Sequence, residues 1–180
     1  MATNDVLIET GTPQVWADTT DYSAVTSGYA RTVQLDLTGV ATGKAQQGVK
    51  ANMGAKRAKT WACLVGLEFA TAPAAGTACH VYWSTSFSAA AGTGNDGGAS
   101  GADDAYQDSS EAEWVKQLTK IGSIILTNDA TPAIQRAFVG YLEYIPQYGM
   151  PILLNSSGVT LMTDAVEMYI ALVPLNDEVA

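Results

Sequence analysis

Charged residues are scarce in this sequence. They make up 15% of its 180 residues, whereas about 25% is usual for a globular domain. Small uncharged residues, above all Ala, Gly, Ser and Thr, take their place. A monomer normally keeps its surface charged, so a surface of small residues indicates that partner subunits cover much of it. An extracellular β protein with an ordinary low-charge surface is the alternative.

Basic residues are scarcer than acidic ones. Nine Lys and Arg stand against 18 Asp and Glu, for a net charge of −9. This balance argues against a nucleic-acid partner, because phosphate binding needs a surplus of basic side chains on one face. One stretch nevertheless gathers Lys44, Lys50, Lys56, Arg57 and Lys59. It predicts either a basic patch that meets an acidic neighbour or a solvated loop with scattered lysines.

Histidine and cysteine are almost absent, with one and two copies. A Ser-His-Asp or Cys-His catalytic group would need His80, which lies inside a predicted strand, and the chain has no Gly-x-Ser-x-Gly motif. We therefore interpret His80 as structural. Cys63 and Cys79 lie among apolar residues, which favours two buried thiols over a disulfide. Neither Cys-x-x-Cys nor His-Glu-x-x-His spacing is present, so we expect no metal and no cofactor.

Acidic residues suggest two further kinds of site, a calcium site and a glycosidase site. The Asn-Asp-Gly-Gly turn at 95–98 has oxygen ligands for calcium but lacks the EF-hand spacing, and solvated acids are the alternative. Glu68, Glu143 and Glu167 lie in predicted strands as candidates for a glycosidase pair, a mechanism that requires a separation the sequence does not give. Without a complete catalytic pattern, we predict that the chain is not an enzyme.

Long apolar runs are also missing. No stretch approaches the ~20 apolar residues that span a bilayer, and the first five residues lack the basic start and apolar run of a signal peptide. We therefore expect no membrane contact and a chain that stays in the cytosol until it joins an assembly.

Short stretches of alternating apolar and polar residues dominate what is present. Residues 29–37 follow the period of two of a half-buried strand, and Pro, Gly, Asn and Ser clusters separate similar stretches. No convincing amphipathic helix appears. The pattern predicts an all-β chain, a jelly-roll-like β-sandwich of about eight short strands with long loops. The strands expected are 6–9, 29–37, 60–69, 78–84, 115–127, 134–144, 151–155 and 167–174.

The domain limits and one alternative fold follow from the same pattern. We expect a single sandwich domain over 28–180, preceded at 1–27 by an N-terminal arm or a first strand. An immunoglobulin-like sandwich is the alternative, although its usual Cys and Trp spacing is missing.

Two long loops stand out between the strands. Residues 42–59, with three glycines among polar and basic residues, predict an exposed basic loop. Residues 86–108 contain almost no bulky apolar side chain, which predicts either a mobile loop or one ordered by another chain. Tyr106 in this loop suits a subunit contact, where Tyr is enriched.

The four tryptophans, Trp16, Trp61, Trp83 and Trp114, are far apart in the sequence, and three of them adjoin apolar strand residues. Core or interface packing explains them, with sugar stacking as the alternative.

Several short runs share one character, at 42–58, 68–76, 82–84, 94–98, 101–103, 117–118, 121–122 and 148–159. Together they resemble structural proteins of tailed bacteriophages. The resemblance extends over residues 36–175 and implies a virion role without catalytic meaning. Within that group, proteins of this size are similar to jelly-roll capsid decoration (cement) proteins, which sit on the shell as trimers.

The resemblance implies a specific set of partners. It predicts a homotrimer that binds the major capsid protein on the capsid surface of the virion after a period in the host cytoplasm. A tail, neck or head-fibre component and a carbohydrate-binding attachment module are the alternatives. The contact residues expected are Lys44, Lys50, Lys56, Arg57, Lys59 and Tyr106.

Overall fold

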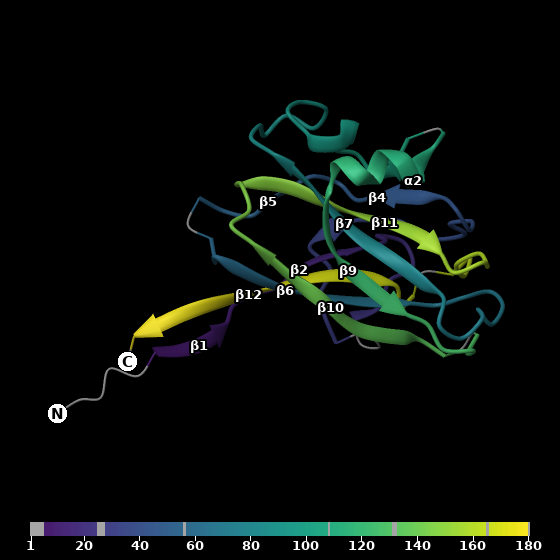
Figure 1. Cartoon of the computed structure of the whole chain (residues 1–180). Helices are drawn as coiled ribbons and strands as arrows, with labels where there is room; N and C mark the ends of the chain where they lie inside the picture. The colour runs from purple at the N-terminus through teal and green to yellow at the C-terminus, as the bar shows by residue number, and fades with distance from the viewer. Residues whose placement is uncertain are drawn as a thin grey trace.

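The computed structural model describes residues 6–24, 28–55, 57–107, 109–130, 133–164 and 166–179. These residues form two β-sheets packed face to face (Figure 1). The predicted β-sandwich is therefore confirmed at the level of a mostly-β, two-sheet architecture.

One sheet, here called sheet A, has five strands on a continuous path in the order β10-β6-β12-β2-β3, and β1 pairs with β12 off this path. All pairs are antiparallel except β2 with β3. The strands are β1 (Val6–Thr10), β2 (Gln14–Ala17), β3 (Val33–Gln34), β6 (Thr60–Leu67), β10 (Gln135–Glu143) and β12 (Tyr169–Val179).

The other sheet, sheet B, runs β8-β4-β11-β7-β9, with β5 also paired to β11. A few short helical turns cover one side of it, and among the described residues no helix meets the length and apolarity of a bilayer span. The strands are β4 (Ala45–Gln47), β5 (Ala51–Asn52), β7 (Ala78–Ser86), β8 (Asp104–Ala105), β9 (Thr119–Ile125) and β11 (Tyr148–Ser156). The turns are η1 (Asp96–Gly98), α2 (Glu111–Trp114) and η2 (Val115–Gln117).

The strand predictions hold best where the alternation is longest. Residues 60–69 and 134–144 contain β6 and β10, and residues 78–84 lie within β7. In the range 29–37 only β3 is a strand, and the range 115–127 begins with the helical turn η2 before β9. The basic loop contains the short strands β4 and β5. The described part of 1–27 supplies β1 and β2, both of them in sheet A.

The core lies between the sheets and follows the alternation of β6. Trp61, Cys63 and Val65 are buried on its inner face. Trp16 and Trp83 are fully buried as well, so packing explains three of the four tryptophans. Both cysteines are buried free thiols, as predicted, and burial raises the pKa of Cys79 to about 12.

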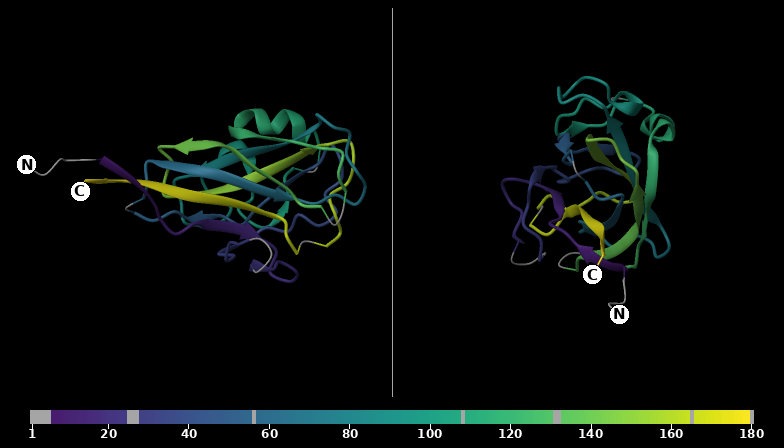
Figure 2. Two further views of the ribbon diagram at one scale, coloured as in Figure 1. Left: turned by 90° about the horizontal axis from the view of Figure 1, so that it is seen from below. Right: turned by 90° about the vertical axis from the view of Figure 1, so that its left-hand side faces the viewer.

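A two-stranded ribbon extends from one end of the sandwich. It consists of β1 and the last residues of β12, paired antiparallel from Val6 opposite Val179 to Thr10 opposite Leu175. Figure 1 and the left view of Figure 2 show the ribbon reaching beyond the sheets. The other strands of sheet A stop where the ribbon begins.

Candidate functional site

The predicted basic residues do not form one patch. Lys44 makes an ion pair with Glu111 of α2 at 2.7 Å. Burial raises the pKa of Glu111, but the hydrogen bond and charge of Lys44 outweigh it and leave this pKa below its usual value. Lys44 therefore already has an acidic partner within the chain. Lys56 lies outside the described residues.

Lys50 holds the start of the 86–108 loop. Its Nζ donates to Ser86 Oγ at 3.0 Å and to the carbonyl oxygens of Ser88, Ala90 and Thr93 at 2.6–3.1 Å. Partial burial lowers the pKa of Lys50. The ammonium group thus organises a loop that has little apolar surface of its own.

The same loop is held further along by its own polar side chains. Asn95 Nδ2 donates to Ala91 O at 2.7 Å and to Ala99 O at 2.6 Å, and Asp103 Oδ1 accepts the N–H of Asp36 at 2.9 Å. The described part of the loop is therefore held by contacts within its own chain. These hydrogen bonds fix the path of a loop that has few apolar side chains to pack.

Tyr106 is not a surface residue. Its side chain is fully buried and its hydroxyl donates to Gly97 O at 2.6 Å. Burial raises its pKa to about 12. In this structure Tyr106 presents no surface to a partner, which corrects the expected subunit contact; it anchors the 86–108 loop instead.

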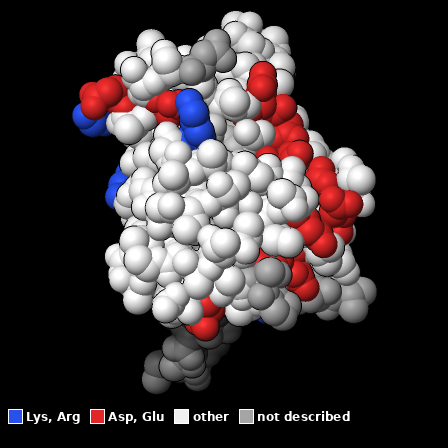
Figure 3. Space-filling view, turned by 90° about the vertical axis from the view of Figure 1, so that its right-hand side faces the viewer, with Lys and Arg blue, Asp and Glu red and all other residues white. Residues whose placement is uncertain are grey.

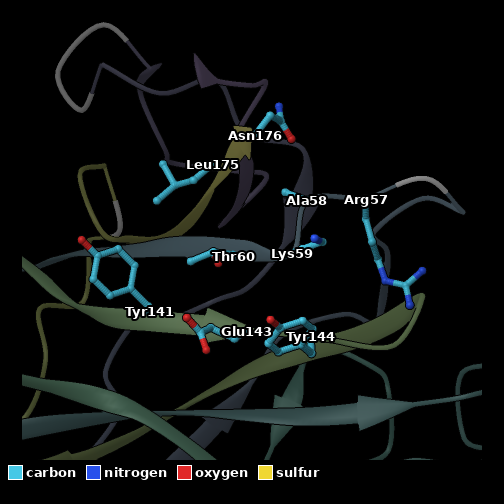
Figure 4. A pocket seen from close by; sticks show the side chains of 9 residues that line it. All are labelled: Arg57, Ala58, Lys59, Thr60, Tyr141, Glu143, Tyr144, Leu175 and Asn176. Carbon is cyan, nitrogen blue, oxygen red and sulfur yellow. The ribbon is translucent and has the colours of Figure 1, made fainter. Parts of the chain in front are cut away.

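Arg57 and Lys59 come together in a groove at the base of the ribbon (Figure 4). The groove has a volume of about 710 Å³. One wall comes from the end of β10, another from β12 and the start of β6, and Arg57 closes one side. Its lining residues are Arg57, Ala58, Lys59, Thr60, Tyr141, Glu143, Tyr144, Leu175 and Asn176.

Main-chain contacts fix the shape of the groove. Arg57 Nε donates to Ile145 O at 2.6 Å, and the Tyr144 N–H donates to Lys59 O at 2.8 Å. Tyr144 has a φ of 51°, a left-handed conformation that is uncommon for a residue with a side chain. This turn leaves 78% of the Tyr144 side chain exposed beside Arg57.

Exposed aromatic residues continue from the groove across the outer face of sheet A. Phe138 and Tyr141 of β10 are 52% and 57% exposed, and their rings meet edge to face with centroids 4.9 Å apart. The strand register sets beside them the half-buried Ala62, Leu64 and Val173. We call the groove and these five residues the assembly face.

Charge is distributed unevenly over the molecule. Figure 3 looks at the end of the sandwich away from the ribbon, where acidic side chains form a band along one side and the few Lys and Arg lie on the other side beside further acidic side chains. The groove, by contrast, has Arg57 and Lys59 with one acid, Glu143.

The candidate catalytic and metal residues do not assemble in this groove as a set. Glu68 and Glu167 lie near one another, where burial and the Glu68 charge raise the pKa of Glu167, while Glu143 lies in the groove. His80 Nδ1 is 2.7 Å from Ser123 Oγ; burial and then Lys120 lower its pKa. Among the described side chains no group of three His, Cys, Asp or Glu is arranged to hold a metal.

The assembly face contains residues that the sequence patterns did not single out, namely Phe138, Tyr141, Tyr144 and Leu175. The first two occupy outward positions of a strand that the alternation predicted correctly. Bulky aromatic residues at outward positions were the available signal for a contact surface.

Comparison of the chain with protein-family models, curated proteins and solved structures gave no match. The fold places the chain in the class of two-sheet β-sandwiches. The most distinctive surface of the molecule is the assembly face, which lies beside the projecting ribbon. The resemblance to tailed-phage proteins stays a prediction.

Proposed function

We propose that this chain is a structural subunit of a bacteriophage virion, a capsid decoration protein that stabilises the shell by protein–protein contacts. The observation that carries the proposal is the assembly face, where exposed aromatic side chains adjoin a groove with an anchored arginine. Tyr, Phe and Arg are enriched at protein interfaces, and the residues that dominate binding energy are mostly of these kinds.

The low surface charge supports the same role. A shell protein repeats one set of modest contacts by symmetry, and an uncharged surface costs little to desolvate against a neighbour. The phage-like segments favour the capsid surface as the location, with the major capsid protein and further copies of the chain, as a homotrimer, as partners. A jelly-roll strand arrangement and the lack of enzymatic activity are parts of this proposal.

Binding to capsids that lack the protein tests the proposal. We expect the purified chain to sediment with such capsids and to raise the temperature at which they break open. Tyr141→Ala should weaken binding roughly tenfold or more, as expected for a central aromatic contact. Phe87→Ala is the matched control, because Phe87 is 83% exposed but does not belong to the assembly face. Wild-type protein that does not bind capsids would contradict the proposal.

Two alternatives have their own tests. A neck or tail component would be present in tens of copies per particle, whereas a decoration protein should approach the copy number of the major capsid protein. Carbohydrate binding draws support from the two exposed tyrosines beside Glu143 and Asn176 in the groove, since aromatic faces and polar groups together suit sugar rings. Glycan-array binding that is lost in Tyr144→Ala would favour it.

A further inference from the structure

The ribbon leaves main-chain groups unpaired on the β12 side. The Gly11 N–H donates to Pro174 O at 3.0 Å, and antiparallel partners alternate between hydrogen-bonded and non-bonded pairs. From Pro174 onward, the main-chain hydrogen-bonding groups of every second residue of β12 therefore point toward β1. Asp177 and Val179 lie between or beyond these positions, so their N–H and C=O groups point to the opposite side.

No described strand pairs with β12 on that opposite side. β6 follows β12 only as far as Thr60, opposite Leu175. The other edge of the ribbon is open too, because the same alternation directs the main-chain groups of Val6, Ile8 and Thr10 away from β12, and β1 pairs with β12 alone among the described strands.

Such a ribbon needs a partner. An isolated two-stranded ribbon is marginally stable in water, and an open strand edge is a template for another chain. β1 and β12 run in opposite directions, so the β12 edge of one copy can pair antiparallel with the β1 edge of a second copy whose ribbon points the same way. Repeated about a rotation axis, this contact closes a ring with no open edge, whereas pairing β12 with β12 leaves both β1 edges open.

Charge favours the same contact. The described ribbon residues include Glu9, Asp177 and Glu178 and no Lys or Arg. The groove beside the open β12 edge contains Arg57 and Lys59, and no ion pair joins either of them to another described side chain. A neighbouring copy that pairs with this edge therefore brings a segment of negative net charge next to a groove of positive net charge.

We propose that the ribbons join copies of this chain: the β12 edge of each subunit pairs with the β1 edge of the next, and three subunits close a six-stranded barrel around a three-fold axis. The number three rests on the proposed function, which expects a homotrimer. The contact itself rests on the open edges and on the charge of the groove.

The mass of the full chain in solution tests the contact, measured by light scattering on a size-exclusion column without capsids. We expect three times the 18.8 kDa chain mass. Asp177→Pro removes an edge donor without removing a bond to β1, so its mass should fall to that of one chain. Asp177→Ala is the matched control, since it loses the same carboxylate but keeps the N–H, and it should stay trimeric at concentrations at which Asp177→Pro is a single chain. Ile8→Pro and Ile8→Ala repeat the comparison on β1.

A second variant covers the case in which a proline disturbs folding. Lys59→Glu reverses an exposed charge of the groove and leaves the Arg57 bond to Ile145 in place, so it should weaken the trimer while the melting temperature of the sandwich stays unchanged. Lys120→Glu, an exposed lysine of β9, controls for charge reversal and should stay trimeric.

The outcomes separate this inference from the proposed function. A wild-type monomer, or folded proline variants that keep the wild-type mass, would overturn the edge contact whatever the chain does on a capsid. A dimer lost in Asp177→Pro and kept in Ile8→Pro would mean two-fold pairing of β12 and would overturn the ring. A trimer that is lost in both proline variants, but that does not bind capsids, would leave the edge contact standing and count against the decoration role.

Discussion

Trp16 and Trp83 meet edge to face between the two sheets, with ring centroids 5.6 Å apart and an interplanar angle of 83°. Trp16 belongs to β2 of sheet A and Trp83 to β7 of sheet B. Edge-to-face aromatic pairs add about 0.5–1.5 kcal/mol beyond their buried area. The pair therefore links the sheet that continues into the ribbon to the sheet that holds the 86–108 loop.

Gly149 makes room for this pair. A Cβ at Gly149 would overlap ring atoms of Trp83, so Gly149→Ala should destabilise the fold by about 1–3 kcal/mol, the usual cost of overpacking. Calorimetry would register a drop in melting temperature of roughly 2–4 °C per kcal/mol. Gly92→Ala is the control, because its Cβ meets only Ser100 O at an ordinary 3.7 Å. An unchanged melting temperature in Gly149→Ala would mean that Trp83 moves freely.

Lys50 should control the order of the 86–95 segment. Lys50→Met keeps the length of the side chain but removes the donor of four hydrogen bonds. We expect amide hydrogen exchange in 86–95 to accelerate at least roughly tenfold, since locally held segments open when their contacts are lost. Lys116→Met, which removes only an exposed pair with Glu113, should leave this segment unchanged. Equal exchange in the two variants would contradict the assigned role.

The hydroxyl of Tyr106 should stabilise the fold in addition to its buried ring. Tyr106→Phe leaves the Gly97 carbonyl without this donor, and loss of one buried hydrogen bond costs about 1 kcal/mol. Chemical denaturation should record this loss without a change of oligomeric mass. A change of oligomeric mass would instead indicate that Tyr106 takes part in a subunit contact, as the sequence predicted.

Glu167 should make stability depend on pH. Burial and the neighbouring Glu68 raise its pKa above the ordinary 4.5, against an opposing effect of Arg136. A raised folded-state pKa gives stability that is present below 4.5 and is lost as pH rises through the folded value. Glu167→Gln imitates the neutral acid, so it should match the wild type near pH 4 and melt at a higher temperature at pH 8. A variant less stable than the wild type at pH 8 would show that Arg136 dominates.

The strands were predictable where the local alternation is long, as in β6, β7 and β10, because one buried face imposes a period of two on the sequence. The short strands β3, β4 and β5 were not. They contain two or three residues each, too few to express a period, and they exist because longer neighbours pair with them.

The contact residues were harder to predict than the strands, because their roles depend on distant partners. Lys50 bonds residues 36 to 43 positions away, and Arg57 bonds Ile145, 88 positions away. The run of basic residues therefore predicted either one patch or scattered lysines, whereas the fold uses Lys44 and Lys50 internally and leaves Arg57 and Lys59 in the groove.

An image reconstruction of virions that contain this chain tests the central claim most directly. The account predicts three-fold density on the outer capsid surface, at a copy number near that of the major capsid protein, with the ribbons at the axis and Tyr141 against a neighbouring protein. Density confined to the neck or tail, or its absence from the particle, would contradict it.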